Sequence, residues 1–210
     1  MVVIDDDLKG SEVRLWKLIE ERTRTGANTR AIDERIWDLF GEDAAVMFTD
    51  LSGFSRQVAA FGIIHFLQVI YEQKALLLPI VQAYDGILVK IEADSFLIVF
   101  RRPRRALDCA IAMQHACQGV NQRRLPEERI LLCVGIGWGR ILRIGDKDCY
   151  GAEVNAASKL GEDTAGADDV LITGAVREAV GEIPGLAFEE LQATIPGTDK
   201  AYRVLYEKLL

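Results

Sequence analysis

Two aspartates of this sequence lie where they could act together on a metal ion. Asp50 follows the apolar run Ala44–Phe48, and Asp94 lies in a tight segment between two extended runs. Converging carboxylates without a neighbouring histidine or cysteine are hard oxygen ligands suited to Mg²⁺ or Mn²⁺. A pair of such ions can clamp the attacking and leaving oxygens of a phosphoryl-type transfer. Aspartates at strand ends are also ordinary turn or cap residues, so that interpretation stays open.

The segments around these aspartates alternate between strand and helix patterns. Strands are expected at 44–51, 87–92, 96–101, 130–137 and 139–144, and helices at 55–84, 103–122 and 154–163. This order predicts an α+β fold, an α/β sandwich with a ferredoxin-like βαββαβ core. Additional C-terminal strands are expected at 170–173, 188–191 and 202–206. In this topology the first and third strands are antiparallel neighbours, so Asp50 and Asp94 converge.

The first 42 residues are expected to form a separate helical segment, and residues 43–210 the main domain. Amphipathic patterns predict helices at 10–22, with Ser11 as the cap, and at 30–40. Two short helices cannot form a core of their own. They could serve dimerisation or signal coupling, or simply pack on the domain that follows. Within the main domain, Pro79 predicts a kink or break in the long helix.

The overall composition excludes several classes of protein. The chain has 210 residues and a formal net charge of −7, which argues against a nucleic-acid-binding surface. No run approaches the roughly 18–20 apolar residues of a membrane span. The first ten residues are acidic, unlike a signal peptide, so a soluble, cytoplasmic protein is expected.

Cysteines, histidines and two short motifs carry weaker signals. The four cysteines lack C-x-x-C spacing and are expected to be reduced core thiols, and His65 and His115 are expected to serve packing. Gly135–Gly139, reading GIGWG, matches a dinucleotide-binding fingerprint only superficially, because its glycine spacing is wrong and no helix follows. Arg101–Arg105 is expected to be a solvated basic patch rather than an anion site.

Three ordered motifs resemble those of one family. FTDLSGF at 48–54 is similar to the first metal motif of class III nucleotidyl cyclases, and KIEAD at 90–94 resembles their Lys-x-x-Gly-Asp hairpin. DCYGAEVNAASKL at 148–160 resembles their Asp-x-x-Gly-x-x-Val-Asn-x-Ala-Ser-Arg segment. From about residue 44 to residue 207, the chain is therefore identified as similar to a class III adenylate/guanylate cyclase catalytic domain.

The resemblance implies a role for each matched residue. Asp50 and Asp94 would hold two divalent ions, Mg²⁺ or Mn²⁺, with the Leu51 carbonyl assisting. Lys90 and Asp148 would read adenine, since an ammonium can donate to a ring nitrogen and a carboxylate can accept from the exocyclic amine. ATP is thus the implied substrate.

The resemblance also implies the reaction and the assembly. Asn155 and Lys159 lie four residues apart, on one helix face, where the family orients the ribose and stabilises charge on the α-phosphate. ATP would be converted to 3′,5′-cyclic AMP and pyrophosphate at sites between the two chains of a homodimer. Lys200 is a candidate for holding the terminal phosphates.

Four positions depart from the family pattern. Ala93 replaces the hairpin glycine, which costs about 1 kcal/mol if φ is positive there. Lys159 replaces arginine and predicts weakened activity, and Pro196-Gly197 stands where the family has Lys-Gly. Glu92 adds an acid beside the pair, expected to be a solvated charge. The second candidate function is therefore a weak or inactive cyclase-like domain that binds nucleotide or dimerises. A cyclase for another base is the third candidate function.

Overall fold

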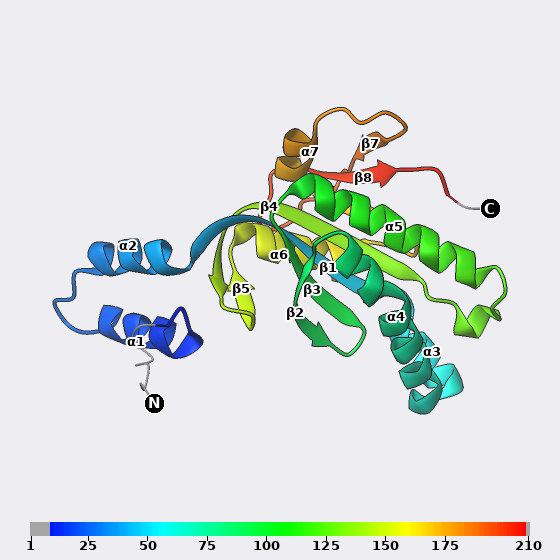
Figure 1. Cartoon of the computed structure of the whole chain (residues 1–210), viewed down its shortest axis with the longest axis horizontal. Helices are drawn as coiled ribbons and strands as arrows, with labels where there is room; N and C mark the ends of the chain where they lie inside the picture. The colour runs from blue at the N-terminus through cyan, green and yellow to red at the C-terminus, as the bar shows by residue number, and fades with distance from the viewer. Residues whose placement is uncertain (1–8, 209–210) are drawn as a thin grey trace.

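The computed structural model describes residues 9–208, so most of the acidic first ten residues lie outside the described residues (Figure 1). The helices are α1 Glu12–Arg22, α2 Thr29–Phe40, α3 Phe54–Phe61, α4 Ile63–Ala83, α5 Pro103–Asn121, α6 Ala152–Ser158 and α7 Gly174–Val180, with a 3₁₀ turn at Pro126–Glu128 and a π-helical turn at Lys159–Thr164. The strands are β1 Gly41–Leu51, β2 Ile87–Glu92, β3 Ser95–Phe100, β4 Leu132–Ile144, β5 Asp148–Tyr150, β6 Val170–Thr173, β7 Ala187–Glu190 and β8 Ala201–Leu205.

The strands form one mixed sheet with the order β2-β3-β1-β4-β6-β8-β7, and β5 pairs with β4 outside this path. The first four strands in this order have the ferredoxin-like arrangement, with β1 antiparallel to both β3 and β4. β6 joins β4 in parallel, and β8 and β7 extend the sheet. The predicted fold class, including the additional C-terminal strands, is confirmed.

Helices cover the sheet on both faces, which makes the predicted sandwich (Figure 1). Alternate β1 residues face opposite layers, because successive strand side chains point to opposite sides. Ala45 and Met47 belong to the main core under α4 and α5, whereas Ala44 and Val46 belong to the smaller cluster under α6. Asp50 continues the second series and therefore lies on the α6 face.

Pro79 was expected to mark a kink or break in the long helix, and the prediction of a break there is wrong. The chain breaks earlier, at Gly62, whose φ of +86° lies in the left-handed region that glycine adopts without a Cβ penalty. α4 then continues through Pro79 to Ala83. Leu77 and Val81 are buried on either side of Pro79, so packing against the core outweighs the lost backbone hydrogen bond.

The two strands expected at 130–137 and 139–144 are one strand, β4, which starts at Leu132. Three alternate glycines, Gly135, Gly137 and Gly139, mark the face of β4 that meets α6 and the π-helical turn. A Cβ added at Gly135 would lie 2.2 Å from the Ala157 carbonyl oxygen. The GIGWG motif is therefore a surface for close helix packing, and the sequence patterns missed β5 and α7.

The N-terminal helices form a hairpin that extends away from the main body (Figure 1). Their buried residues form a small cluster with Ile144 at the end of β4; its helical members are Leu15, Leu18, Ile32, Ile36 and Phe40. α2 runs directly into β1 at Gly41. Ser11 occupies the N-cap position of α1 but makes no capping hydrogen bond, whereas the Asn28 side chain caps α2 by accepting from Ala31 N–H.

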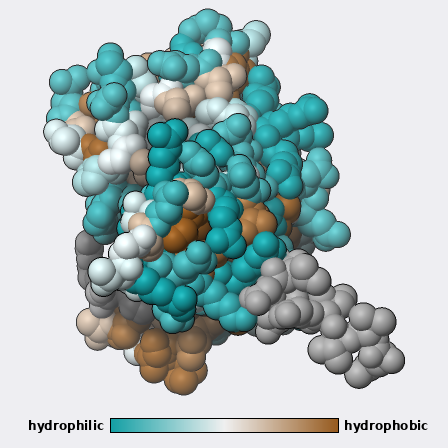
Figure 2. Space-filling view, turned by 90° about the vertical axis from the view of Figure 1, so that its left-hand side faces the viewer, coloured by the Kyte–Doolittle hydropathy of each residue, from teal (hydrophilic) through white to brown (hydrophobic). Residues whose placement is uncertain are grey.

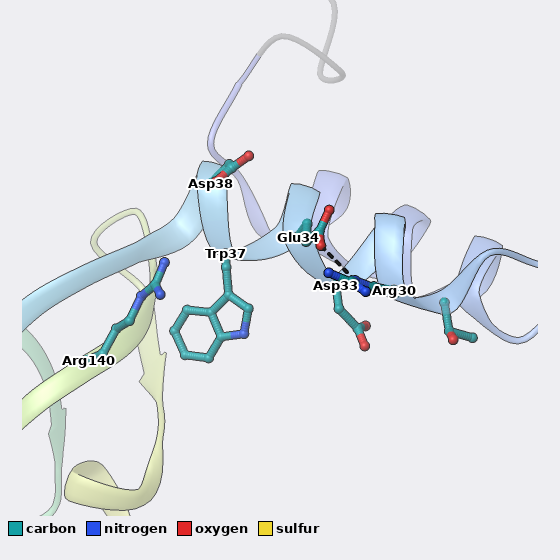
Figure 3. Close-up of a pocket in the computed structure, with 7 residues that line it drawn as sticks. Arg30, Asp33, Glu34, Trp37, Asp38 and Arg140 are labelled. Atoms are coloured by element: carbon teal, nitrogen blue, oxygen red, sulfur yellow. Dashed lines mark hydrogen bonds and ion pairs between the residues drawn. The ribbon is translucent and has the colours of Figure 1, made fainter.

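A contact between Trp37 and Arg140 joins α2 to strand β4 of the sheet (Figure 3). The Arg140 guanidinium of β4 lies 4.8 Å from the centroid of the Trp37 ring, a cation–π arrangement. Both residues line an open, polar cavity of about 460 Å³. The hairpin therefore meets the main domain through an aromatic and cationic contact as well as through its apolar cluster.

Large apolar side chains are exposed where α3 meets α4. Figure 2 shows hydrophobic atoms along the bottom edge of the molecule, at the height of α3 in Figure 1. The exposed residues there are Phe61, Ile63, Ile64, Leu67 and Tyr71. Among residues 9–208, no helix has the length and apolar character needed to cross a membrane.

Candidate functional site

Asp50 and Asp94 converge at the adjoining ends of β1 and β3. The Ser95 hydroxyl donates to Asp50 Oδ1 at 3.2 Å, which links the two strand ends. Burial, and then the neighbouring charge of Asp94, raise the pKa of Asp50 to about 6. Burial also raises the pKa of Asp94, which is only 6% exposed. The predicted convergence of these carboxyl groups is confirmed.

The donor set at this point fits a hard divalent cation. Asp94 Oδ2 is buried and has no hydrogen-bond partner among the described residues, so it retains a free acceptor. Two neighbouring buried carboxyl groups with raised pKa values are stabilised as anions by a cation between them. The Leu51 backbone N–H favours the ionised form of both carboxyl groups. Within residues 9–208, no cluster of three or more acidic, histidine or cysteine side chains forms a metal site, so these aspartates stand as a pair.

Lys90 and Asp148 are brought together from β2 and β5. Lys90 Nζ lies 3.7 Å from Asp148 Oδ2 and 2.5 Å from Glu92 Oε1. The Cys149 backbone N–H donates to Asp148 Oδ1 at 2.9 Å and holds that carboxylate in place. Glu92, expected to be a solvated charge, has a side chain that is 68% exposed and also pairs with Lys90.

A cavity of about 90 Å³ lies beside this pair, and Ser95, which donates to Asp50, is part of its lining. It is lined by Phe48, Lys90, Glu92, Ser95, Phe96, Leu97, Asp148 and Glu162. Phe48 and Leu97 provide an apolar floor, since they pair across β1 and β3. The patterns missed Glu162, whose charge contributes to the raised pKa of Asp94. Its position near the end of the helix expected at 154–163 carried no signal that it would reach this cavity.

α6 carries Asn155 and ends just before Lys159. Asn155 is exposed on α6, and Lys159 is the first residue of the π-helical turn. Lys159 Nζ donates to Asp163 Oδ2 at 2.5 Å, and this hydrogen bond raises the lysine pKa. The structure thus pairs the Lys159 ammonium within its own helical segment.

Glu153, which the sequence patterns missed, anchors the first turn of α6. Glu153 Oε2 accepts from the Trp138 backbone N–H at 3.0 Å and from the Thr173 hydroxyl at 2.8 Å. Its backbone lies against Gly137, where a Cβ would come within 2.4 Å of the Glu153 carbonyl oxygen. Burial raises the pKa of this carboxyl group. The anchor fixes α6, and with it Asn155, against β4 and β6.

Lys200 lies just before β8 and lines a different cavity, of about 660 Å³, together with Glu153. Its ammonium pairs with Glu190 Oε2 at 3.2 Å. The loop that carries it packs on α6, because Gly197 faces the Ala152 carbonyl oxygen. Lys200 is therefore near the start of α6, on the far side of β4 from β2 and β3 in the sheet order.

The structure also shows the surroundings of the cysteines, the two histidines and the basic patch at 101–105. All four cysteines are free and buried, as expected, and burial raises each thiol pKa to about 12. His65 and His115 are half-buried and bond to backbone carbonyl oxygens, which agrees with packing roles. In the basic patch, Arg101, Arg104 and Arg105 each pair with an acidic side chain. The patch is thus a set of surface ion pairs.

Ala93 has a φ of +50°, so the hairpin does need the conformation that glycine favours. We expect Ala93→Gly to raise the free energy of unfolding by about 0.5–1 kcal/mol, because left-handed strain exceeds the entropic cost of glycine. Urea titration would measure a higher midpoint at constant slope. Ala31→Gly, within α2, is the control and should lower stability by about 1 kcal/mol. A lower midpoint for Ala93→Gly would contradict the strain.

Comparison with known proteins agrees with this fold. Residues 40–199 match the sequence profile of the family described as adenylate and guanylate cyclase catalytic domain. The match covers well over half of the chain, and the structure has the corresponding sheet. The chain therefore belongs to the class III adenylate/guanylate cyclase catalytic domain family.

Two curated relatives and several solved structures are similar to this chain. Putative adenylate cyclase 3 of Rhizobium meliloti is 33% identical over 65% of this chain and 23% of that protein. Serine/threonine-protein kinase pkn2 of Myxococcus xanthus is 28% identical over 76% of this chain and 19% of that protein. The chain thus spans less than a quarter of the length of either relative.

The similar solved structures include cyclases named for both purines. The adenylyl cyclase CyaB from P. aeruginosa has a TM-score of 0.66 at 19% identity, covering 80% of this chain and 96% of its own. The guanylyl cyclase Cya2 has a TM-score of 0.62 at 18% identity, covering 79% and 93%. An adenylate/guanylate cyclase/hydrolase from Silicibacter pomeroyi has a TM-score of 0.64 at 25% identity, covering 78% and 95%. The first two likenesses establish the fold alone.

Proposed function

We propose that this chain is a divalent-metal-dependent adenylate cyclase that converts ATP to 3′,5′-cyclic AMP and pyrophosphate as a homodimer. The observation that carries the proposal is the pair Lys90 and Asp148, 3.7 Å apart, which line one cavity together with Ser95, the residue that donates to Asp50. A donor beside an acceptor suits the ring nitrogen and exocyclic amine of adenine. Guanine presents a carbonyl and a ring N–H at the corresponding edge, which reverses part of that pattern.

Asp50 and Asp94 are the proposed holders of two ions, Mg²⁺ or Mn²⁺, with the Leu51 carbonyl assisting. The free acceptor Asp94 Oδ2 and the raised pKa of both carboxyl groups support this role. When bound, the ions supply positive charge that stabilises the attacking 3′-oxygen and the triphosphate. The protein's own contribution is to hold these carboxylates in place and to orient the nucleotide.

Asn155 and Lys159 are proposed to orient the ribose and to stabilise charge on the α-phosphate, and Lys200 to hold the terminal phosphates. The ribose 3′-oxygen attacks the α-phosphorus in line, and pyrophosphate leaves. Asn155 is exposed on α6, where a second copy can present it to the metal aspartates. Residues 1–42 are proposed as a dimerisation or regulatory segment attached to the catalytic domain.

The alternative function is a catalytically weak or inactive domain that binds nucleotide or dimerises. The pairing of Lys159 with Asp163 and of Lys200 with Glu190 favours it, because both cations already have partners. This alternative is opposed by the presence of both proposed metal aspartates together with Lys90 and Asp148.

Incubation of the purified chain with each of the four nucleoside triphosphates and Mn²⁺ would test the proposal. Cyclic AMP from ATP, absent with Asp50→Ala, is the expected result. Failure to form any cyclic nucleotide from dimeric protein at high concentration would reject the catalytic function. Cyclic GMP as the dominant product would reject only the assigned base.

We expect Lys159→Arg to raise turnover. Arginine presents a planar fork that contacts two phosphate oxygens, whereas lysine presents a single point charge. Since one transition-state donor is worth about 10²–10³ in rate, partial recovery of its contacts should give a gain on the order of tenfold. Steady-state rates at saturating ATP and Mn²⁺ would measure it, with Lys159→Ala as the control that loses further activity. Unchanged turnover in Lys159→Arg would show that lysine is not the cause of weak activity.

A further inference from the structure

A buried glutamine lies behind the aspartate pair. Gln73 is completely buried on the inner face of α4, which it shares with Val69, Ile70 and Leu77. Its side-chain Nε2 donates to the Asp94 backbone carbonyl oxygen at 2.9 Å. An amide in an apolar layer costs several kcal/mol, roughly 2–7, unless its hydrogen bonds are made. A core position of α4 is therefore occupied by a polar residue that contacts Asp94, which bears one of the two site carboxyl groups.

The turn that Gln73 contacts requires an external support. Asp94 follows Ala93, whose φ of +50° is strained for a residue with a Cβ. The Asp94 carboxyl group also lies beside Asp50, and each is held in a buried environment that raises its pKa. Repulsion between the two ionised carboxylates favours movement of Asp94 away from Asp50, and the strained turn offers a second incentive to rearrange. A hydrogen bond from a rigid helix to the Asp94 carbonyl opposes this movement.

We propose that Gln73 is a positioning residue that holds the Asp94 hairpin against Asp50, and so sets the affinity of the aspartate pair for a divalent cation. The inference rests on the proposed metal role of the pair. Gln73 acts through the Asp94 backbone, to whose carbonyl oxygen its Nε2 donates. Its effect is therefore expected on metal affinity rather than on base recognition or on ATP binding at saturating metal.

Gln73→Met is the informative variant, because methionine has a similar length and no hydrogen-bond donor. Loss of an outer-shell partner typically weakens metal binding about 10–100-fold. We expect the dissociation constant for Mn²⁺ alone to rise by at least about tenfold, as measured from the electron paramagnetic resonance signal of free Mn²⁺. In the active enzyme, the Mn²⁺ concentration for half-maximal rate should rise similarly, while the KM for ATP at saturating Mn²⁺ is unchanged.

Gln114 offers a matched control on α5. It too is completely buried, and its Nε2 donates to the carbonyl oxygens of Leu132 and Asp169 at 3.0 and 3.1 Å, away from the Asp94 turn. Gln114→Met removes comparable core hydrogen bonds and should therefore lower the urea midpoint. It should leave Mn²⁺ affinity within about twofold, because none of these hydrogen bonds is made to the Asp94 turn. Gln73→Asn, which is one methylene shorter, keeps the amide but cannot span the same distance, and should weaken Mn²⁺ binding even if Gln73→Met does not fold.

The outcomes separate this inference from the proposed function. If the unmodified protein binds Mn²⁺ no better than Asp50→Ala does, the metal site itself is rejected, and the role of Gln73 with it. If binding depends on Asp50 but Gln73→Met or Gln73→Asn binds Mn²⁺ normally, only the positioning role is overturned. Equal weakening in Gln114→Met would attribute the effect to general loosening of the core and would also overturn it.

Discussion

Mixing two inactive variants, Asp50→Ala and Asn155→Ala, restores cyclase activity if each site is built from two chains. In a mixed dimer, the intact Asp50 of one chain faces the intact Asn155 of the other, so one of the two sites is complete. With free exchange of chains, half of the dimers are mixed, and roughly a quarter of all sites are active. Cyclic AMP formation after co-incubation, relative to the unmodified protein at equal concentration, measures this recovery.

A second mixture supplies the control for this experiment. Asp50→Ala and Asp94→Ala remove carboxylates that converge within one chain, where Ser95 links the two strand ends. Their mixed dimers have no complete pair, so no activity should return. Recovery from this second mixture would contradict the assignment of both aspartates to one chain. Lack of recovery from the first mixture, with chain exchange verified, would contradict sites shared between chains.

Asp50→Asn removes activity and makes the metal-free protein more stable at neutral pH. A lost metal carboxylate is expected to lower turnover by about 10³ or more, since the charge stabilisation of the transition state is lost. The stability gain has a separate origin. The pKa of Asp50 is about 6 in the folded chain, because it is buried beside Asp94, and the unfolded value is about 3.9.

The direction of the pH dependence follows from these two values. Between about pH 4 and pH 6 the folded state binds more protons than the unfolded state, so stability falls as the pH rises through this window. Above pH 6 wild-type Asp50 is an anion held unfavourably, and Asp50→Asn removes that penalty. We expect a gain of about 1–2 kcal/mol at pH 7.5 after allowing for solvent screening, and little difference below about pH 4.

Urea unfolding in the presence of a chelator at both pH values measures this gain. Mn²⁺ should stabilise the unmodified protein and leave Asp50→Asn unaffected, because ligands stabilise only the state that binds them. Asp163→Asn is a suitable control, since Asp163 is an exposed partner of Lys159 and should change stability by less than about 0.5 kcal/mol. A loss of stability in metal-free Asp50→Asn at pH 7.5 would show that the carboxyl pair is not strained.

Local sequence patterns were sufficient for the outline of the fold. The continuous apolar run Ala44–Phe48 in β1 and the tight turn at Ala93–Asp94 are properties of a few neighbouring residues. The convergence of Asp50 and Asp94 could therefore be predicted from the expected strand order. The strand at Val170–Thr173 was predicted with its observed bounds for the same reason. Because side chains two residues apart in a strand point to the same face, Asp50 lies on the face that Phe48 occupies.

Features that depend on distant segments could only be decided by the tertiary structure. The helix break at Gly62 instead of Pro79 depends on how Leu77 and Val81 pack in the core. The glycines of β4 acquire their role only when α6 lies on them at backbone distance.

At the site, contacts with distant segments decide the roles of Gln73, Glu153 and Glu162. Nothing in the neighbouring sequence marks Gln73 as the donor to Asp94, 21 residues away, or Glu153 as the acceptor from Trp138 and Thr173. The candidate site residues could thus be proposed from short motifs. The support that holds Asp94 beside Asp50 arises because a buried polar group must find its partner wherever the fold brings one.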